Sequence, residues 1–159
     1  MRKRKKFFVI LFILASIGLF IFAGIVLKNN NRYTPPAITA PIEIPADGVV
    51  TDFNEVEKSD KPAVVMFYVD WCTYCRRFMP VFGDFAKQYK DNYIFAAINC
   101  DKPENIKYVQ EYHIMGFPTL YIVDTKINHK FSLSMSATAN ETVMKEELNN
   151  YLNVRKNFL

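Results

Sequence analysis

The chain has 159 residues and a formal net charge of +4 at pH 7. Five of its 20 Lys and Arg residues fall within the first six positions, so the remaining 15 are balanced by 16 Asp and Glu residues. The excess positive charge is therefore confined to one end of the chain, which argues against nucleic-acid binding.

The next 21 residues, 7–27, contain no charged side chain and are rich in Phe, Ile and Leu. At ~1.5 Å per residue, a helix of this length spans about 30 Å, the hydrocarbon thickness of a bilayer. We interpret the segment as an uncleaved signal anchor that crosses the membrane once. A cleaved signal peptide is the alternative, but its apolar core would be about 7–15 residues long and would precede a small-x-small site. The basic residues before the segment predict a cytoplasmic tail over residues 1–6 and a domain outside the cytoplasm.

Residues 28–48 contain four prolines and the run Asn29-Asn30-Asn31, and they show no helix or strand periodicity. This composition is typical of a stiff, extended spacer. The remaining residues, 49–159, are enough for one compact domain.

Within this domain, helix and strand patterns alternate along the chain. Two continuous apolar runs, 63–69 and 93–98, are typical of strands that are buried on both faces of a sheet. Two shorter strands, 120–123 and 130–133, are expected to form a hairpin. Helices are expected over residues 52–59, 72–89, 103–112 and 140–151. The order predicts an α/β fold in which helices cover both faces of one sheet.

The sequence Trp71-Cys72-Thr73-Tyr74-Cys75 lies where the first apolar run passes into a helix. The N-terminus of a helix carries partial positive charge and unpaired N–H groups, which stabilise a thiolate. Cysteines in this position have pKa values of roughly 3.5–7.5. Cys72 is therefore expected to be nucleophilic near neutral pH, and Cys75 is close enough to attack a mixed disulfide formed there. The motif predicts thiol–disulfide exchange, with Cys72 and Cys75 as the catalytic residues.

Other uses of a C-x-x-C pair fit the sequence less well. A closed zinc site needs four ligands, and Cys100, His113 and His129 form no second pair with suitable spacing. Arg76 follows Cys75 where the covalent haem motif requires His. A disulfide that closes so small a loop constrains little of the unfolded chain, which argues against a purely structural role. We expect no bound metal and no cofactor.

Further motifs are spaced along the domain as in one known family. They are Pro80, eight residues after Cys72; Ile98-Asn99-Cys100-Asp101, at the end of the second apolar run; and Gly116-Phe117-Pro118-Thr119. Together with the C-x-x-C pair, they make residues 63–152 resemble the thioredoxin superfamily. The resemblance implies a thioredoxin-like fold with a central mixed sheet, and thiol–disulfide oxidoreductase activity.

The resemblance also implies how substrate binds. Pro118 matches the family's cis proline, which lies beside the cysteines and turns the backbone of Phe117 toward an extended substrate. An ordinary trans turn is the alternative. The other positions expected at the substrate surface are Trp71, Thr73, Tyr74 and Ala137.

Two positions depart from thioredoxins proper. Met66 stands where the family carries a buried aspartate, and Ala97 where many members carry the lysine that pairs with it. The usual buried proton relay is therefore missing, which argues against a fast reductase of the cytosolic type. Asp70 is a nearby acid, and we expect it to be a solvated charge at the rim of the site.

Cys100 has two interpretations. At the end of a central strand it is expected to be a small buried apolar residue. The family match also places it near the rim of the active site, where it would be a possible third thiol. An odd cysteine in a domain outside the cytoplasm is notable, because it leaves one thiol without a partner in the chain.

We therefore predict a single-pass protein of the bacterial inner membrane whose C-terminal domain faces the periplasm or the cell surface. It would reduce, oxidise or isomerise disulfides, with protein thiols and disulfides of the cell envelope as partners. A membrane redox protein is a further candidate partner. Two alternatives come from other classes: a redox-inactive binding module, and a chaperone for a soft metal ion such as Cu(I).

Overall fold

The computed structural model describes residues 40–159. The predicted basic tail, the predicted membrane-spanning segment over residues 7–27 and the first part of the predicted spacer lie outside these residues. Within residues 40–159, no helix is long and apolar enough to cross a bilayer.

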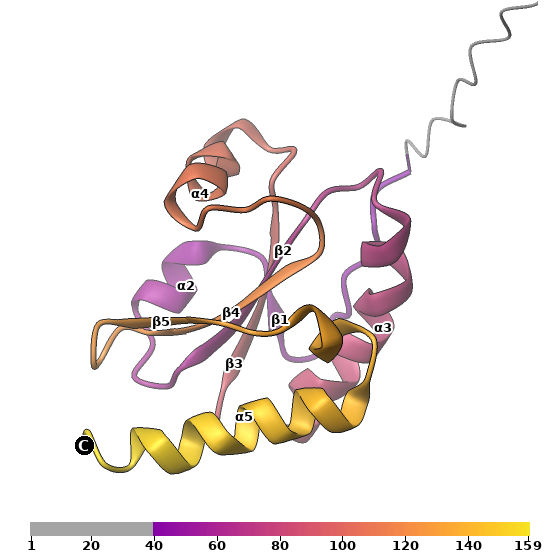
Figure 1. The fold of residues 1–159 in the computed structure, drawn as a ribbon. Helices are drawn as coiled ribbons and strands as arrows, with labels where there is room; N and C mark the ends of the chain where they lie inside the picture. Colours follow the sequence, from indigo (N-terminus) through magenta and orange to yellow (C-terminus); the bar gives the residue numbers. More distant parts are fainter. Residues whose placement is uncertain (1–39) are drawn as a thin grey trace, which may run out of the picture. The chain divides into compact units, whose positions relative to one another are not determined.

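Five strands form one mixed sheet in the order β1-β3-β2-β4-β5 (Figure 1). β1 and β2 run parallel to β3, whereas β4 is antiparallel to β2 and β5 is antiparallel to β4. The strands are β1 (Val49–Val50), β2 (Ala63–Tyr68), β3 (Ile94–Asn99), β4 (Thr119–Asp124) and β5 (His129–Ser132). All of β2 and nearly all of β3 is buried, which explains why both occur as uninterrupted apolar runs. The predicted mixed sheet and its hairpin are confirmed.

Helices α2 (Phe53–Glu57) and α4 (Ile106–Glu111) cover one face of the sheet. Phe53 stacks on Tyr108 with ring centroids 4.3 Å apart, and both rings lie about equally far from Phe67 of β2, at 6.4 and 6.3 Å. A 3-10 turn, η1 (Pro103–Asn105), precedes α4. The structure therefore divides the single helix predicted over residues 103–112 into two short pieces.

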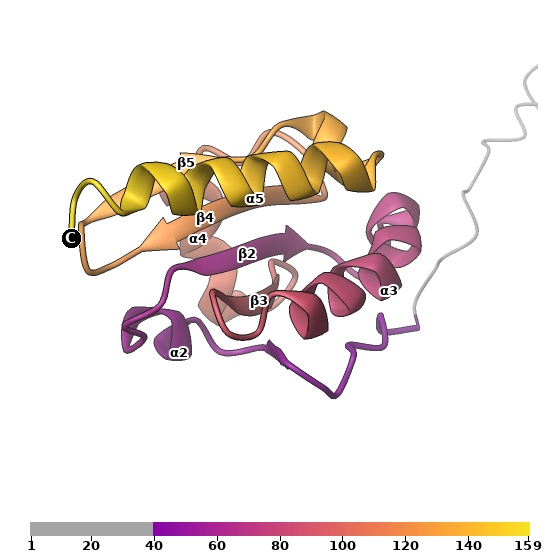
Figure 2. The same ribbon diagram turned by 90° about the horizontal axis from the view of Figure 1, so that it is seen from below.

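Helices α3 (Thr73–Gln88) and α5 (Glu141–Arg155) pack on the other face. Phe82 of α3 meets Phe95 of β3 edge to face at 5.2 Å. The Tyr93 hydroxyl, just before β3, donates a hydrogen bond to the Leu148 carbonyl of α5 at 2.8 Å. Figure 2 shows α5 and α2 on opposite sides of β2, so the helices cover both faces as predicted.

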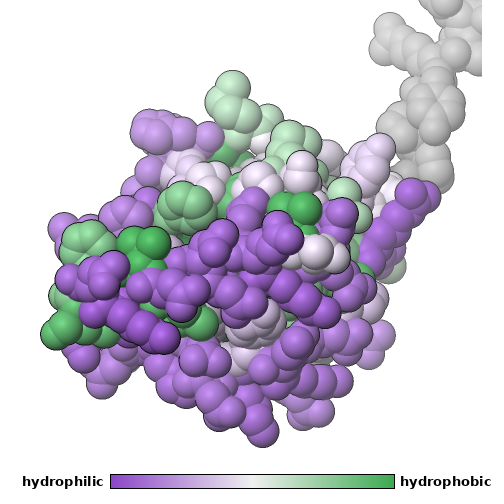
Figure 3. Space-filling view, turned by 60° about the horizontal axis from the view of Figure 1, so that its bottom comes forward, coloured by the Kyte–Doolittle hydropathy of each residue, from purple (hydrophilic) through white to green (hydrophobic). Residues whose placement is uncertain are grey.

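Helix α5 begins where the sequence predicts and ends later. The Asn140 side chain caps it by accepting from the Thr142 N–H at 2.9 Å. The helix continues to Arg155, whose guanidinium is paired with the buried carboxylate of Asp124, and the Tyr151 hydroxyl donates to the same carboxylate. Figure 3 shows a mainly hydrophilic surface, with apolar side chains at its left end and others along its upper part. At the C-terminal end of α5, Phe131, Val154 and Phe158 line an apolar hollow.

Residues 40–48 were predicted to belong to the spacer, but they pack against the domain. The predicted boundary between spacer and domain at residue 49 is therefore wrong. We call residues 40–48 the N-terminal strap. Ile42 is buried in the core. Farther along, Pro45 lies against Gly83 so closely that a Cβ on Gly83 would stand 2.5 Å from Pro45 Cγ. The strap leads into β1, a two-residue strand that is too short to show a periodicity in the sequence.

Candidate active site

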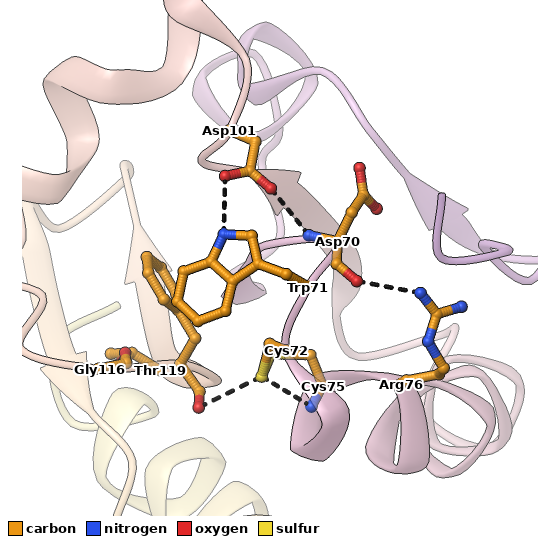
Figure 4. Close-up of a disulfide and its surroundings, with 9 residues drawn as sticks. Asp70, Trp71, Cys72, Cys75, Arg76, Asp101, Gly116 and Thr119 are labelled. Atoms are coloured by element: carbon orange, nitrogen blue, oxygen red, sulfur yellow. Dashed lines mark hydrogen bonds between the residues drawn. A yellow bond between two sulfur atoms is a disulfide. The ribbon is translucent and has the colours of Figure 1, made fainter. Parts of the chain in front are cut away.

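Cys72 and Cys75 form a disulfide at the start of α3, with their Cα atoms 5.2 Å apart (Figure 4). Cys72 is the N-cap residue of the helix, and its Sγ accepts a hydrogen bond from the Cys75 N–H at 3.0 Å. Cys72 is 6% exposed and Cys75 is fully buried. Of the two sulfur atoms, the one at the helix N-terminus is therefore the one that a reaction partner can reach.

The loop before β4 lies beside this disulfide. The Phe117–Pro118 peptide bond is cis, as predicted, and the Phe117 carbonyl oxygen lies 3.5 Å from Cys72 Sγ. A pocket opens here between the start of α3 and the loop. It is lined by Trp71, Cys72, Thr73, Tyr74, Ile114, Met115, Gly116 and Phe117. The fold thus brings together the predicted residues from two segments that are about 45 positions apart in the chain.

The pocket has an exposed apolar rim. Trp71 is 60% exposed, Tyr74 72% and Met115 98%. The Trp71 ring packs edge to face on Phe117, with centroids 6.2 Å apart. Sequence reasoning missed Met115 and Ile114, although their position immediately before Gly116 could have suggested them. Ala137, which was expected at this surface, is instead buried within the 3-10 turn η2 (Met135–Thr138).

Asp101 holds Trp71 in place. Its carboxylate accepts from the Trp71 indole N–H at 3.2 Å and from the Asp70 backbone N–H at 2.9 Å (Figure 4). Asp101 itself is fixed by its own N–H, which donates to the Asn99 side chain at 2.9 Å. The loop that carries Trp71 and Cys72 is therefore tied to the end of β3.

Asp70 is not the solvated rim charge that the sequence suggested. Its carboxylate is partly buried and accepts from the Ile42 N–H and from the Asn99 side-chain amide, each at 2.8 Å. Across the same loop, the Arg76 guanidinium donates to the Asp70 carbonyl at 3.0 Å and to the Ala40 carbonyl at 2.7 Å. These contacts join the active-site loop to the N-terminal strap, which no sequence motif indicated.

Met66 and Ala97, the two positions that depart from the family pattern, lie opposite each other in the paired strands β2 and β3. Both side chains are buried. The interior of the sheet therefore has an apolar pair at the two positions where thioredoxins carry ionisable groups.

Cys100 is unpaired and buried, and it does not line the pocket. Burial, and secondarily the negative charge of Asp101, raise the pKa of its thiol from 9.0 to about 11. The folded state therefore binds the thiol proton more tightly than the unfolded state does. This difference stabilises the fold fully below pH 9.0, and the stabilisation is lost as the pH rises through about 11. This environment supports the interpretation of Cys100 as a buried apolar residue over its use as a third reactive thiol.

This environment predicts a selective labelling pattern. In the reduced, folded protein at about pH 8, iodoacetamide is expected to modify Cys72 and to leave Cys100 unmodified, because a buried thiol with a raised pKa carries almost no thiolate. Mass spectrometry of tryptic peptides, before and after unfolding in urea, measures this. Labelling of Cys100 in the folded protein at the rate of Cys72 would instead make it an accessible third thiol.

Neither histidine lines the active-site pocket. His113 is an exposed residue with a φ of 50°, and His129 stacks on Tyr151 with ring centroids 6.2 Å apart. Across residues 40–159, no three His, Cys, Asp or Glu side chains are grouped as a metal site would require.

Comparison with known proteins supports the resemblance. The family described as Thioredoxin matches residues 49–152. The chain is 31% identical over 103 residues to thioredoxin from Rickettsia typhi, which covers 59% of this chain and 96% of that protein. It is 39% identical over 72 residues to protein disulfide-isomerase A5 from Bos taurus, covering 43% of this chain.

The larger relatives match over a small part of their length. The chain spans 13% of the bovine protein and 20% of a mitochondrial thioredoxin domain-containing protein from Schizosaccharomyces pombe. Among solved structures, oxidised thioredoxin O1 from Arabidopsis thaliana superimposes with a TM-score of 0.53 and 22% identity, covering 65% of this chain and 97% of that one. That structure supports the fold, while the match over residues 49–152 supports the family. The chain belongs to the thioredoxin family.

Proposed function

We propose that this protein is a thiol–disulfide oxidoreductase that is anchored in a membrane and acts on disulfides outside the cytoplasm. The observation that carries the oxidoreductase activity is the Cys72–Cys75 disulfide at the N-terminus of α3, beside an open apolar pocket. A helix N-terminus stabilises the thiolate that forms when such a disulfide is reduced.

In the reducing direction, the Cys72 thiolate attacks a substrate disulfide. The substrate S–S bond breaks, one substrate sulfur leaves as a thiolate, and the other is joined to Cys72. Cys75 then loses its proton and attacks Cys72 Sγ, which releases the second substrate thiolate. The substrate gains two electrons, and Cys72 and Cys75 lose two and return to the disulfide. The reverse sequence oxidises a substrate dithiol.

The structure offers no ionisable side chain at Met66 or Ala97 to receive the Cys75 proton. We infer that this proton is transferred to water or to the leaving substrate thiolate. Phe117 contributes its backbone and its ring to substrate binding, because its carbonyl oxygen faces Cys72 Sγ and its ring packs on Trp71. Pro118, Thr73 and Tyr74 complete the proposed substrate surface.

The anchoring and location rest on the sequence. Residues 7–27 are long and apolar enough to span a bilayer, and the basic residues before them favour a cytoplasmic N-terminus. We propose that the domain faces the periplasm or the outer cell surface of a bacterium, with envelope proteins as substrates and a membrane redox protein as a candidate partner.

Turnover of insulin with dithiothreitol as the reductant tests the activity, with Cys72→Ser as the inactive control. The Cys72–Cys75 reduction potential then determines the direction: a value near −270 mV would indicate a reductant, and one near −120 mV an oxidant. Absence of turnover together with an unreactive Cys72 would favour a binding module instead. Copper that copurifies under anaerobic conditions would favour the Cu(I) chaperone.

A further inference from the structure

The chain enters the described domain at the active-site end. The Arg76 guanidinium holds the Ala40 carbonyl at 2.7 Å, and the Asp70 carboxylate holds the Ile42 N–H at 2.8 Å. Arg76 immediately follows Cys75, and Asp70 lies two residues before Cys72. The two points that fix the start of the strap therefore flank the redox pair on both sides.

From there the strap runs alongside α3, away from the cysteines. Pro45 lies against Gly83. Near the other end of the helix, a Cβ atom added to Gly48 would lie 3.6 Å from the Ala86 Cβ. The C-terminus of the chain lies at the opposite side of the domain from the start of α3 (Figure 1). A domain of this size is roughly 35 Å across, from a radius of gyration of about 14 Å. A tether that joins the domain at residue 40 is therefore attached beside the active site, whereas a tether at the opposite side would be attached roughly a domain width away from it.

The length of the intervening chain limits this distance. Between the proposed membrane span, which ends at residue 27, and the strap there are 12 residues, 28–39. Twelve residues reach at most about 40 Å when fully extended. We infer that the Cys72–Cys75 pair works at the bilayer surface, on a disulfide or dithiol that an integral membrane protein exposes within about 40 Å of the membrane. This inference rests on the proposed anchoring.

The surface around the pair indicates the chemistry of the partner segment. Among residues 40–159, no charged side chain lines the active-site pocket, and its rim consists of exposed Trp71, Tyr74 and Met115. An extended segment with apolar, uncharged residues beside its cysteine fits this rim, since it would cover the apolar surface without burying an unpaired charge.

A matched pair of substrates tests the inference with the full-length protein in proteoliposomes. Both are the same cystine-containing peptide with apolar flanking residues, one free in solution and the other attached to a lipid headgroup. The protein is first reduced with dithiothreitol, which is then removed, so that each Cys72–Cys75 dithiol supplies the two electrons for one peptide disulfide. We expect the anchored peptide to be reduced at least about tenfold faster than the free one at equal total concentration, because a shared surface raises the effective concentration.

The matched control variant carries a Gly/Ser insertion of about 24 residues after Asn30. Tripling the tether from 12 residues is expected to lower the rate on the anchored peptide about fivefold, from the −3/2 power of tether length, and to leave the rate on the free peptide unchanged. Equal rates on the two peptides, or no effect of the insertion, would overturn the inference.

Trp71 provides a direct second measurement, because it is the only tryptophan in the chain and adjoins Cys72. Energy transfer from Trp71 to dansyl-labelled headgroups is expected in the wild type and should decrease with the insertion. Strong quenching of Trp71 by labels deep in the acyl chains would show that the rim inserts into lipid, which would overturn the protein-partner assignment.

Two controls separate this inference from the proposed function. Retention in the membrane after a carbonate wash tests the anchor, and turnover of the free peptide tests the oxidoreductase activity. A retained, active protein without a preference for the anchored peptide contradicts the inference alone. Loss of retention contradicts the anchor and the inference together, while free-peptide turnover would still support the redox activity.

Discussion

Cys75→Ser is expected to convert this protein into a trap that remains joined to its substrate through Cys72. Cys72 is the partly exposed member of the pair and accepts the hydrogen bond from the helix N-terminus, whereas Cys75 is fully buried. Without the Cys75 sulfur, the mixed disulfide has no neighbouring thiol to resolve it. Turnover should fall by roughly a thousandfold, because an intramolecular attack is replaced by the slow arrival of an external thiol.

Non-reducing gels of the reduced variant, mixed with a disulfide-containing peptide and quenched in acid, measure the trapped complex. Cys72→Ser should neither trap substrate nor turn it over. Cys100→Ser should behave as the wild type, since Cys100 lies outside the pocket. A stable complex formed by Cys72→Ser through Cys75 would reverse the assigned roles.

The largest effect on stability is expected from Arg155→Met. Asp124 is 1% exposed, and its carboxylate is paired with Arg155 and accepts from the Tyr151 hydroxyl. The hydrogen bond to Asp124 raises the pKa of Arg155, and burial raises the pKa of Tyr151, so Arg155 is the charged partner of this carboxylate. Methionine keeps most of the aliphatic packing but leaves a buried carboxylate without its cation, which costs about 3–5 kcal/mol.

Urea unfolding followed by circular dichroism measures this change in the free energy of unfolding. The matched control is Glu111→Gln, which removes the solvent-exposed pair between Glu111 and Lys130. An exposed pair contributes about 0–1 kcal/mol, so the control should remain close to the wild type. If Arg155→Met lowered the free energy of unfolding by as little as the control does, the buried Asp124 carboxylate would not need Arg155 for its stability.

The sequence was most informative where structure is determined locally. The start of α3 could be predicted because Cys72 occupies a capping position directly after an apolar strand, and the two cysteines are one helical turn apart. The position of β2 followed from its buried apolar run. The cis bond at Pro118 was expected from a family motif, whereas nothing in the composition or periodicity of the loop required it.

The strap and the end of α5 depend on contacts between distant residues. Arg76 reaches the Ala40 carbonyl across 36 positions, and Arg155 reaches Asp124 across 31. The backbone groups of Ala40, Pro41 and Ile42 hydrogen-bond to the domain without any repeating sequence pattern, so the composition of residues 40–48 resembled that of a solvated spacer. The prediction that Asp70 is a solvated charge was wrong for the same reason. Its hydrogen-bond partner Ile42 belongs to the strap, which is distant in the sequence.

The close fit of Pro45 on Gly83 has a practical consequence for truncated versions of this protein. A fragment cut at residue 49, where the family match begins, would remove Ile42 from the core and deprive both Asp70 and Arg76 of their strap partners. Measurements of redox potential on such a fragment would describe an altered reaction centre. A soluble version for biochemical work should therefore start before residue 40, so that the N-terminal strap can pack along α3.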